Sequence, residues 1–243
     1  MFTPTFLLLF AAAPSFVHAF TFNFTAPPTQ CTNVTVWWTG GTAPFRLLLV
    51  PTGALHPEVR IIADYTITSG TNLSFPLQYP GNSTFVAVMS DATGFGSGGT
   101  TSGITVTSSL DTSCLRKTQV MPEFLIYTNP SVPQQCTPMM ISYNTDAHPP
   151  VDVFVVIPGG TSSRIESGSP SNRTFSWTPM VQNGTQLMIV AGDTLGAGKG
   201  GSTDILTVAP GNSSCLATQT TNTSASPAPS ATHSSDATPG WPL

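Results

Sequence analysis

An internal repeat constrains the fold of this chain more than any other feature of its sequence. The tripeptide Gln30–Thr32 (Gln-Cys-Thr) returns as Gln135–Thr137, and the glycine-rich segment Asp91–Gly99 returns as Asp193–Gly201. Each copy then closes on a Ser-Cys-Leu tripeptide. Landmarks that recur in the same order are the signature of duplicated structural units, so the sequence predicts two homologous domains in tandem.

The four cysteines fall as one pair in each copy. Four cysteines allow three pairings, and the repeat selects Cys31 with Cys114 and Cys136 with Cys215. Each bridge would join the beginning of a domain to its end, and closing a loop of about 80 residues stabilises a fold by roughly 4–5 kcal/mol in the chain-entropy model. The alternatives, free thiols or a zinc site, lack both Cys-x-x-Cys spacing and a nearby histidine.

Within each copy apolar and polar residues alternate, which is the period of a β-strand. The strands we expect are residues 20–24, 34–38, 45–50, 59–68, 85–90 and 104–107 in the first copy, and 139–143, 151–157, 174–177, 187–191 and 205–208 in the second. Turn residues separate these runs, and no long run has the helical period. The predicted fold class is therefore all-β: two tandem immunoglobulin-like antiparallel β-sandwich domains, each closed by one disulfide, plus a disordered C-terminal tail.

Both ends of the chain are set apart from these domains by composition. A short apolar core at residues 6–13, followed by Val17-His18-Ala19, predicts a secretory signal peptide, because it is too short to span a bilayer. Residues after 216 are rich in Ser, Thr, Ala and Pro and have no apolar tail for a lipid anchor, so we expect the chain to end free in solution. The predicted layout is a signal peptide at 1–19, β-sandwich repeat 1 at 20–116, a linker at 117–123, β-sandwich repeat 2 at 124–216 and a disordered tail at 217–243.

Charged residues make up only 7% of the chain, and its net charge is −4. So few cations cannot neutralise a phosphate backbone, which argues against nucleic-acid binding. Carbohydrate would hydrate such a surface instead, because eight asparagines stand in Asn-x-Ser/Thr triplets without an intervening proline: Asn23, Asn33, Asn72, Asn82, Asn172, Asn183, Asn212 and Asn222. We therefore expect a secreted glycoprotein, extracellular or cell-wall associated, with no transmembrane segment.

The segment Val34–Gly41 (VTVWWTGG), followed by an apolar strand, resembles the KNH-like domain of fungal Ser/Thr-rich cell-wall proteins. In the second copy Phe175–Pro179 (FSWTP), a strand that ends near Asp193 and a last strand at Ile205 carry the same resemblance. The chain is also similar to secreted proteins of mushroom-forming fungi with loops like Asp91–Gly99. The resemblance implies an immunoglobulin-like sandwich and a role at the cell wall or surface, linked to β-glucan. It implies no catalytic residues.

The two glycine-rich segments fit the pattern Gly-x-Gly-x-x-Gly at 94–99 and 196–201. A dinucleotide site would need a helix after this pattern, whereas the first segment leads into another apolar strand at Ile104. We interpret both segments as long connections between the last two strands, with positive φ angles that favour glycine. Asp91 and Asp193 open them, and we expect their carboxylates to accept hydrogen bonds from amides two residues on rather than to bind calcium. No metal and no cofactor is expected.

Nothing in the sequence predicts catalysis. The histidines that follow the signal peptide, His56, His148 and His233, stand apart from one another, and no Gly-x-Ser-x-Gly motif occurs. Glycoside hydrolysis needs two carboxylates across the scissile bond, and only Asp91 recurs as an acid in the second copy.

Trp37 is the candidate ligand-binding residue. By alternation it points away from the core, whereas Trp38 points inward, and its counterpart in the second copy is Ser142, so the fold does not require an aromatic there. Exposed aromatic rings stack on sugar rings and dominate many binding sites. The alternative is that Trp37 packs under a neighbouring glycan, a loop or the other domain.

From these observations the sequence predicts one leading function and two alternatives. The first is a secreted non-catalytic glycoprotein with a structural or interaction role at the fungal cell wall or surface, its partners being wall polysaccharide or surface proteins. The second is a β-glucan-binding or other carbohydrate-binding module, and the third is a polysaccharide-active hydrolase. The sequence leaves the oligomeric state open.

Overall fold

The computed structural model describes residues 20–52, 62–116 and 121–216. The predicted signal peptide and tail, Asn222, His56 and His233 lie outside these ranges. The described chain is all-β, and its strands form four sheets, two from each sequence repeat. The disulfides Cys31–Cys114 and Cys136–Cys215 are both formed, one in each repeat. The predicted class of two tandem, disulfide-closed β-sandwiches is thus confirmed.

The first sandwich packs a three-stranded sheet against a larger one. The smaller sheet has the order β1-β2-β5, and its strands are β1 (Thr21–Phe24), β2 (Asn33–Thr39) and β5 (Asn72–Pro76). The larger sheet has the order β4-β3-β6-β7, with β8 also paired to β6; its strands are β3 (Phe45–Thr52), β4 (Ala63–Ile67), β6 (Thr84–Asp91), β7 (Gly94–Thr100) and β8 (Ile104–Thr105). All these pairings are antiparallel.

The second sandwich repeats this plan. Its smaller sheet has the order β13-β10-β9, and its strands are β9 (Ile126–Asn129), β10 (Met139–Tyr143) and β13 (Thr174–Trp177). Its larger sheet has the order β12-β11-β14-β15, and its strands are β11 (Val151–Val156), β12 (Ser163–Gly168), β14 (Gln186–Gly192) and β15 (Leu206–Thr207).

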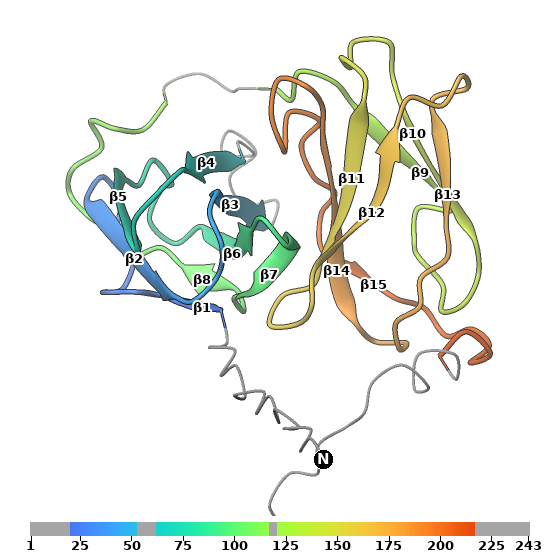
Figure 1. Cartoon of the computed structure of the whole chain (residues 1–243), viewed down its shortest axis with the longest axis horizontal. Helices are drawn as coiled ribbons and strands as arrows, with labels where there is room; N and C mark the ends of the chain where they lie inside the picture. Colours follow the sequence, from blue (N-terminus) through green and yellow to red (C-terminus); the bar gives the residue numbers. More distant parts are fainter. Residues whose placement is uncertain (1–19, 53–61, 117–120, 217–243) are drawn as a thin grey trace, which may run out of the picture.

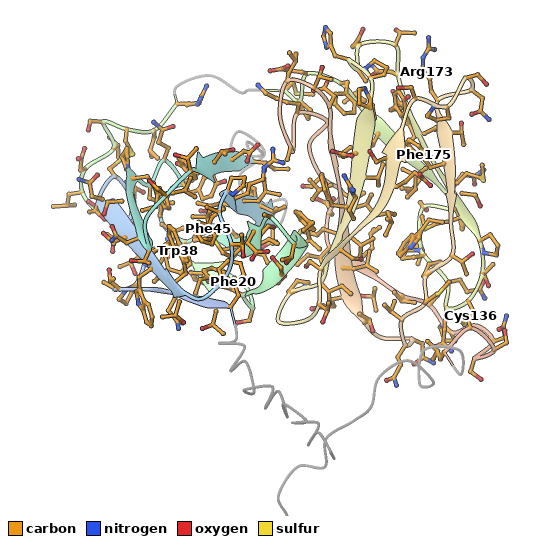
Figure 2. All side chains as sticks on the ribbon, in the orientation of Figure 1. Phe20, Trp38, Phe45, Cys136, Arg173 and Phe175 are labelled. Atoms are coloured by element: carbon orange, nitrogen blue, oxygen red, sulfur yellow. A yellow bond between two sulfur atoms is a disulfide. The ribbon has the colours of Figure 1, made fainter. Side chains whose placement is uncertain are left out.

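Each sandwich encloses a core of alternating strand residues. In the first, Trp38 is 1% exposed and its ring lies 5.1 Å from that of Phe45, which in turn lies 5.6 Å from Phe20 (Figure 2). The indole Nε1 of Trp38 has no hydrogen-bond partner among the described residues. In the second, Tyr143 takes the place of Trp38 and its ring lies 6.0 Å from that of Phe175.

A third apolar cluster joins the two sandwiches. The larger sheets lie against each other, so that β3 and β6 are buried on both faces, and so are β11 and β14. Figure 1 shows the sandwiches side by side, with β7 of the first next to β12 of the second. The cluster contains four residues from β3 and β6 and four from β11 and β14: Leu48, Val50, Val86 and Val88 against Phe154, Val156, Met188 and Val190.

The two halves of this interface are equivalent positions of the repeat. Leu48 is paired with Val88 in the first sandwich, and Phe154 is paired with Val190 at the same place in the second. The same sheet face of each repeat therefore covers the other, as in a two-fold symmetric dimer. Strict alternation along β3 and β11 would have left this face polar. The continuous apolar runs instead indicate burial on both faces.

Candidate functional site

Trp37 lies on the outer face of the β1-β2-β5 sheet, as the alternation predicts. Its side chain is 40% exposed. The backbone amides of Trp38 and Tyr143 make the same inter-strand hydrogen bond in the two sandwiches, which places Ser142 in the position of Trp37. Because a serine serves the same fold in the second sandwich, packing alone does not account for the exposed ring.

Two asparagines of N-glycosylation triplets flank Trp37 in the sheet. Asn23 of β1 pairs with Trp37 on one side, and Asn72 of β5 pairs with it on the other. All three side chains are exposed. Directly paired residues on one face of a sheet are close neighbours. We call Asn23, Trp37 and Asn72 the asparagine–tryptophan row; sequence reasoning missed it because its members come from three strands.

The other acceptor asparagines are exposed as well. Every one of the seven that falls within the described ranges lies on the surface: Asn23, Asn33, Asn72, Asn82, Asn172, Asn183 and Asn212. Asn33 shares the outer face of the first small sheet with the asparagine–tryptophan row, where it pairs with Pro76. An oligosaccharyltransferase could therefore leave a glycan at each of these side chains without disturbing either core.

The acceptor triplets that look equivalent in sequence are not equivalent in the fold. The backbone amides of Cys31 and Cys136 donate hydrogen bonds to the carbonyls of Leu77 and Pro179, so these two carbonyls are equivalent. Asn72, five residues before Leu77, therefore corresponds to Thr174 rather than to Asn172. Likewise the backbone amides of Gly81 and Asn183 donate hydrogen bonds to the side-chain oxygens of the equivalent glutamines Gln30 and Gln135. Asn183 thus corresponds to Gly81 rather than to Asn82. Glycans in the two repeats would leave from different points, and only the first small sheet carries acceptors on its outer face.

The glycine-rich segments lie at the interface between the sandwiches. In the first repeat the expected connection is itself a strand, β7, hydrogen-bonded to β6. A Cβ at Gly96 would lie 2.5 Å from the carbonyl oxygen of Ser162, and a Cβ at Gly198 would lie 2.6 Å from Ile62. Each of these two equivalent glycines thus meets the opposite repeat at a distance that excludes a side chain, and both have positive φ.

Asp91 and Asp193 fix the turns that open these segments, as predicted. The amide of Thr93 donates to Asp91 at 2.9 Å, and the amide of Leu195 donates to Asp193 at 2.9 Å. Desolvation acts to raise the pKa of Asp91, but hydrogen bonds from Thr93, Ser97 and the amide of Thr42 outweigh it and lower the pKa to about 2. Both carboxylates are therefore occupied as structural acceptors.

A groove of about 620 Å³ runs between the repeats beside the apolar interface, and charged side chains line it. Arg46 on β3 donates two hydrogen bonds to Asp64 on β4, at 2.7 and 2.6 Å. Across the groove Arg164 on β12 lies 3.6 Å from Asp152 on β11. Hydrogen bonding to Asp64 raises the pKa of the Arg46 guanidinium, and the charge of Asp152 raises it further.

These two ion pairs occupy equivalent positions of the two repeats, with their charges exchanged. Arg46 and Asp152 are the residues two places before Leu48 and Phe154, and Asp64 and Arg164 are the strand partners of Leu48 and Phe154. The carboxylate of Asp64 also accepts a hydrogen bond from the amide of Ala197 in the second repeat, at 3.1 Å. This hydrogen bond and the charge of Asp152 near Arg46 therefore couple the repeats, and the charged side chains that line the groove are already paired. The opposite signs at equivalent positions 46 and 152 are the sequence signal that could have revealed it.

The described residues show no candidate metal centre. Within them, no three His, Cys, Asp or Glu side chains gather where they could hold a metal ion. His148 lies beside Asp193, with 3.5 Å between its Nδ1 and the carboxylate. No helix of membrane-spanning length and hydropathy occurs in the part of the chain that the structure describes.

No protein-family model matches the chain, and no curated protein matches it. Among solved structures, a segment of two fibronectin type-III domains from chicken tenascin is similar over 77% of this chain and 96% of that chain, with 11% sequence identity and a TM-score of 0.26.

Proposed function

We propose that this chain is a secreted, N-glycosylated, non-catalytic protein with a structural or interaction role at the fungal cell wall or surface. The observation that carries the proposal is the exposure of all seven acceptor asparagines that the structure describes. Two closed disulfides are compatible with an extracellular location. Glycans would also supply the surface hydration that a chain with 7% charged residues otherwise lacks.

The state of five of the described carboxylates favours a non-catalytic role. Asp64 and Asp152 are paired with arginines, and Asp91 and Asp193 hold turns. Glu123 is paired with Lys199. A glycosidase instead needs one carboxylate free to donate a proton and a second one free to attack or to activate water.

The double sandwich favours a structural role. Because the repeats share an apolar interface, flanked by ion pairs, they pack as one unit rather than as two separately tethered domains. A compact, glycosylated unit of this kind is suited to hold or space other surface components, and the resemblance to fungal KNH-like wall proteins agrees with that role.

The test is expression of the full chain in a yeast secretory host. We expect the protein in the medium or the wall fraction, running well above the 25.4 kDa of the polypeptide and shifting down after N-glycan removal. Retention of the protein inside the cell, or an unshifted band, would contradict the proposal.

The alternative is a β-glucan-binding module that uses Trp37, since its ring is exposed on a sheet face. Retention of the wild type on insoluble β-glucan, lost in Trp37→Ala with an unchanged melting temperature, would favour it. The position of two glycan acceptors beside the ring argues against it, because glycans there would obstruct an external polysaccharide.

A further inference from the structure

The asparagine–tryptophan row raises the question of what covers the exposed ring of Trp37. Its neighbours across the sheet on both sides are glycan acceptors, and in the second sandwich the same three positions hold Tyr127, Ser142 and Thr174, none of which is an acceptor. The exposed tryptophan and the flanking acceptors therefore occur together in one repeat and are absent together from the other.

Backbone hydrogen bonding distinguishes the two acceptors. The amide of Trp38 bonds the carbonyl of Thr71, so the adjacent pair Trp37–Asn72 is a non-hydrogen-bonded pair of the ladder. The amide of Thr25 bonds the carbonyl of Thr35, so Asn23–Trp37, two residues along, is a hydrogen-bonded pair. Cα atoms are about 4.5 Å apart in the first kind of pair and about 5.5 Å in the second, and side chains are closer in the first. Asn72 is thus the nearer acceptor.

We propose that Trp37 is the platform on which the first N-acetylglucosamine of the chain's own glycan at Asn72 stacks. The sugar is joined to the Asn72 amide nitrogen and leaves the sheet beside the indole, so that the C–H face of its ring can cover the ring of Trp37. Such contact removes apolar surface of both from water. The inference rests on the proposed glycosylation, and it makes Trp37 a partner of an internal glycan rather than a site for external polysaccharide.

The third residue of the triplet fits this arrangement. Ser74 on β5 is hydrogen-bonded to Thr35 on β2, with 2.6 Å between their hydroxyl oxygens. This bond lies next to Trp37 on the same face and ties the acceptor strand to the tryptophan strand. Asn72→Gln is therefore the proper way to remove the glycan, since a change at Ser74 would also break this bond.

The experiment is a double-mutant cycle on the full chain from a secretory host. Its members are the wild type, Asn72→Gln, Trp37→Ser and the double variant; serine is the residue that the second repeat places there. Peptide mass spectrometry first establishes occupancy at Asn72. We then expect Asn72→Gln to lower the melting temperature by about 2–4 °C in the Trp37 background and to have no effect in the Trp37→Ser background.

Two further variants serve as controls. Asn33→Gln removes a glycan from the same sheet face at a position paired with Pro76, and its effect should be equal in both backgrounds. Trp37→Phe keeps an aromatic platform and should restore part of the coupling with Asn72. Nuclear Overhauser contacts between the Trp37 indole and the N-acetyl group at Asn72 should accompany the coupling.

The outcomes separate this inference from the proposed function. Occupied sites with no coupling between Trp37 and Asn72 would overturn the stacking alone and leave the glycoprotein proposal intact. Coupling that follows Asn23→Gln rather than Asn72→Gln would likewise overturn the assignment to Asn72. Unoccupied acceptors throughout would overturn both.

Discussion

Arg46 and Asp152 occupy the same position in the two repeats and face each other with opposite charges across the interface between them. Each has an ion-pair partner at a second equivalent position, Asp64 and Arg164, whose charges are exchanged as well. Two copies of the first repeat packed through this face would bring arginine against arginine, and two copies of the second would bring aspartate against aspartate. The charge pattern therefore favours pairing of unlike repeats.

Asp152→Arg should weaken this pairing. The new cation would face Arg46 and lie beside Arg164, so we expect a loss of about 1 kcal/mol in the free energy of unfolding at low salt, the size typical of partly exposed charge pairs. Urea unfolding at about 0.05 and 0.5 M NaCl checks this, because salt screens charges of this kind. An effect that does not shrink with salt would assign the loss to packing instead.

Gly96→Ala should destabilise the contact between the repeats. The added methyl would strain a residue with a φ of 73° and would meet the carbonyl of Ser162. Gly99→Ala is the matched control, since Gly99 also has positive φ but has nothing within 4 Å of the added methyl. We expect Gly99→Ala to cost roughly 1–2 kcal/mol from backbone strain and Gly96→Ala about 2 kcal/mol more, measured by denaturant unfolding. Equal costs would mean that the approach of the two repeats at Gly96 is not tight.

Asp91 should make stability depend on pH in the acid range. Its pKa is lowered from 3.8 to about 2 in the folded protein. A lowered folded pKa contributes stability above the unfolded value, and that contribution is lost as the pH falls from about 4 towards 2. Asp91→Asn should therefore flatten the dependence of the melting temperature on pH in that window and leave its slope near neutral pH unchanged. An unaltered acid slope would contradict the hydrogen-bonded turn.

The sequence predicted the parts of the fold that depend on local pattern. Period-two alternation placed Trp38 inside and Trp37 outside, and the repeat selected both disulfides, as the structure confirms. The strands β5, β9 and β12 were not among those predicted. The mainly polar, weakly buried residues of the edge strand β12 carry no clear alternation. Of the expected strand at 59–68, the structure shows β4, Ala63–Ile67, paired with β3; residues 59–61 lie outside the described ranges.

Features that depend on two distant segments could not be predicted. Register decides which acceptors are equivalent, and similar triplets at 72 and 172 concealed a shift of two residues that only the ladder hydrogen bonds reveal. The glycine-rich segments looked like free connections because nothing local shows that another domain lies against Gly96 and Gly198. The neighbours of Trp37 were likewise invisible, since β1 and β5 come from far apart in the chain.

Trp38 offers a test of the first core, where period-two alternation predicted that its side chain would lie. Trp38→Ala should cost about 3–5 kcal/mol, as truncation of large buried side chains does. Trp38→Phe should cost less than half as much, because it keeps a ring beside Phe45 and removes an indole N–H that has no partner. Thermal unfolding of both variants is the measurement. Equal losses would show that the indole, rather than an aromatic ring in general, is needed there.

The packing of equivalent faces has a consequence for how the chain assembles. A lone repeat would expose the apolar face of β3 and β6, or of β11 and β14, and could cover it only by meeting another molecule, at a rate and to an extent set by concentration. Joining two such units in one polypeptide holds the partner at a fixed, high effective concentration, so the contact forms even when the protein is dilute. Dilution would dissociate a weak dimer of single repeats, but it leaves this covalently linked pair assembled.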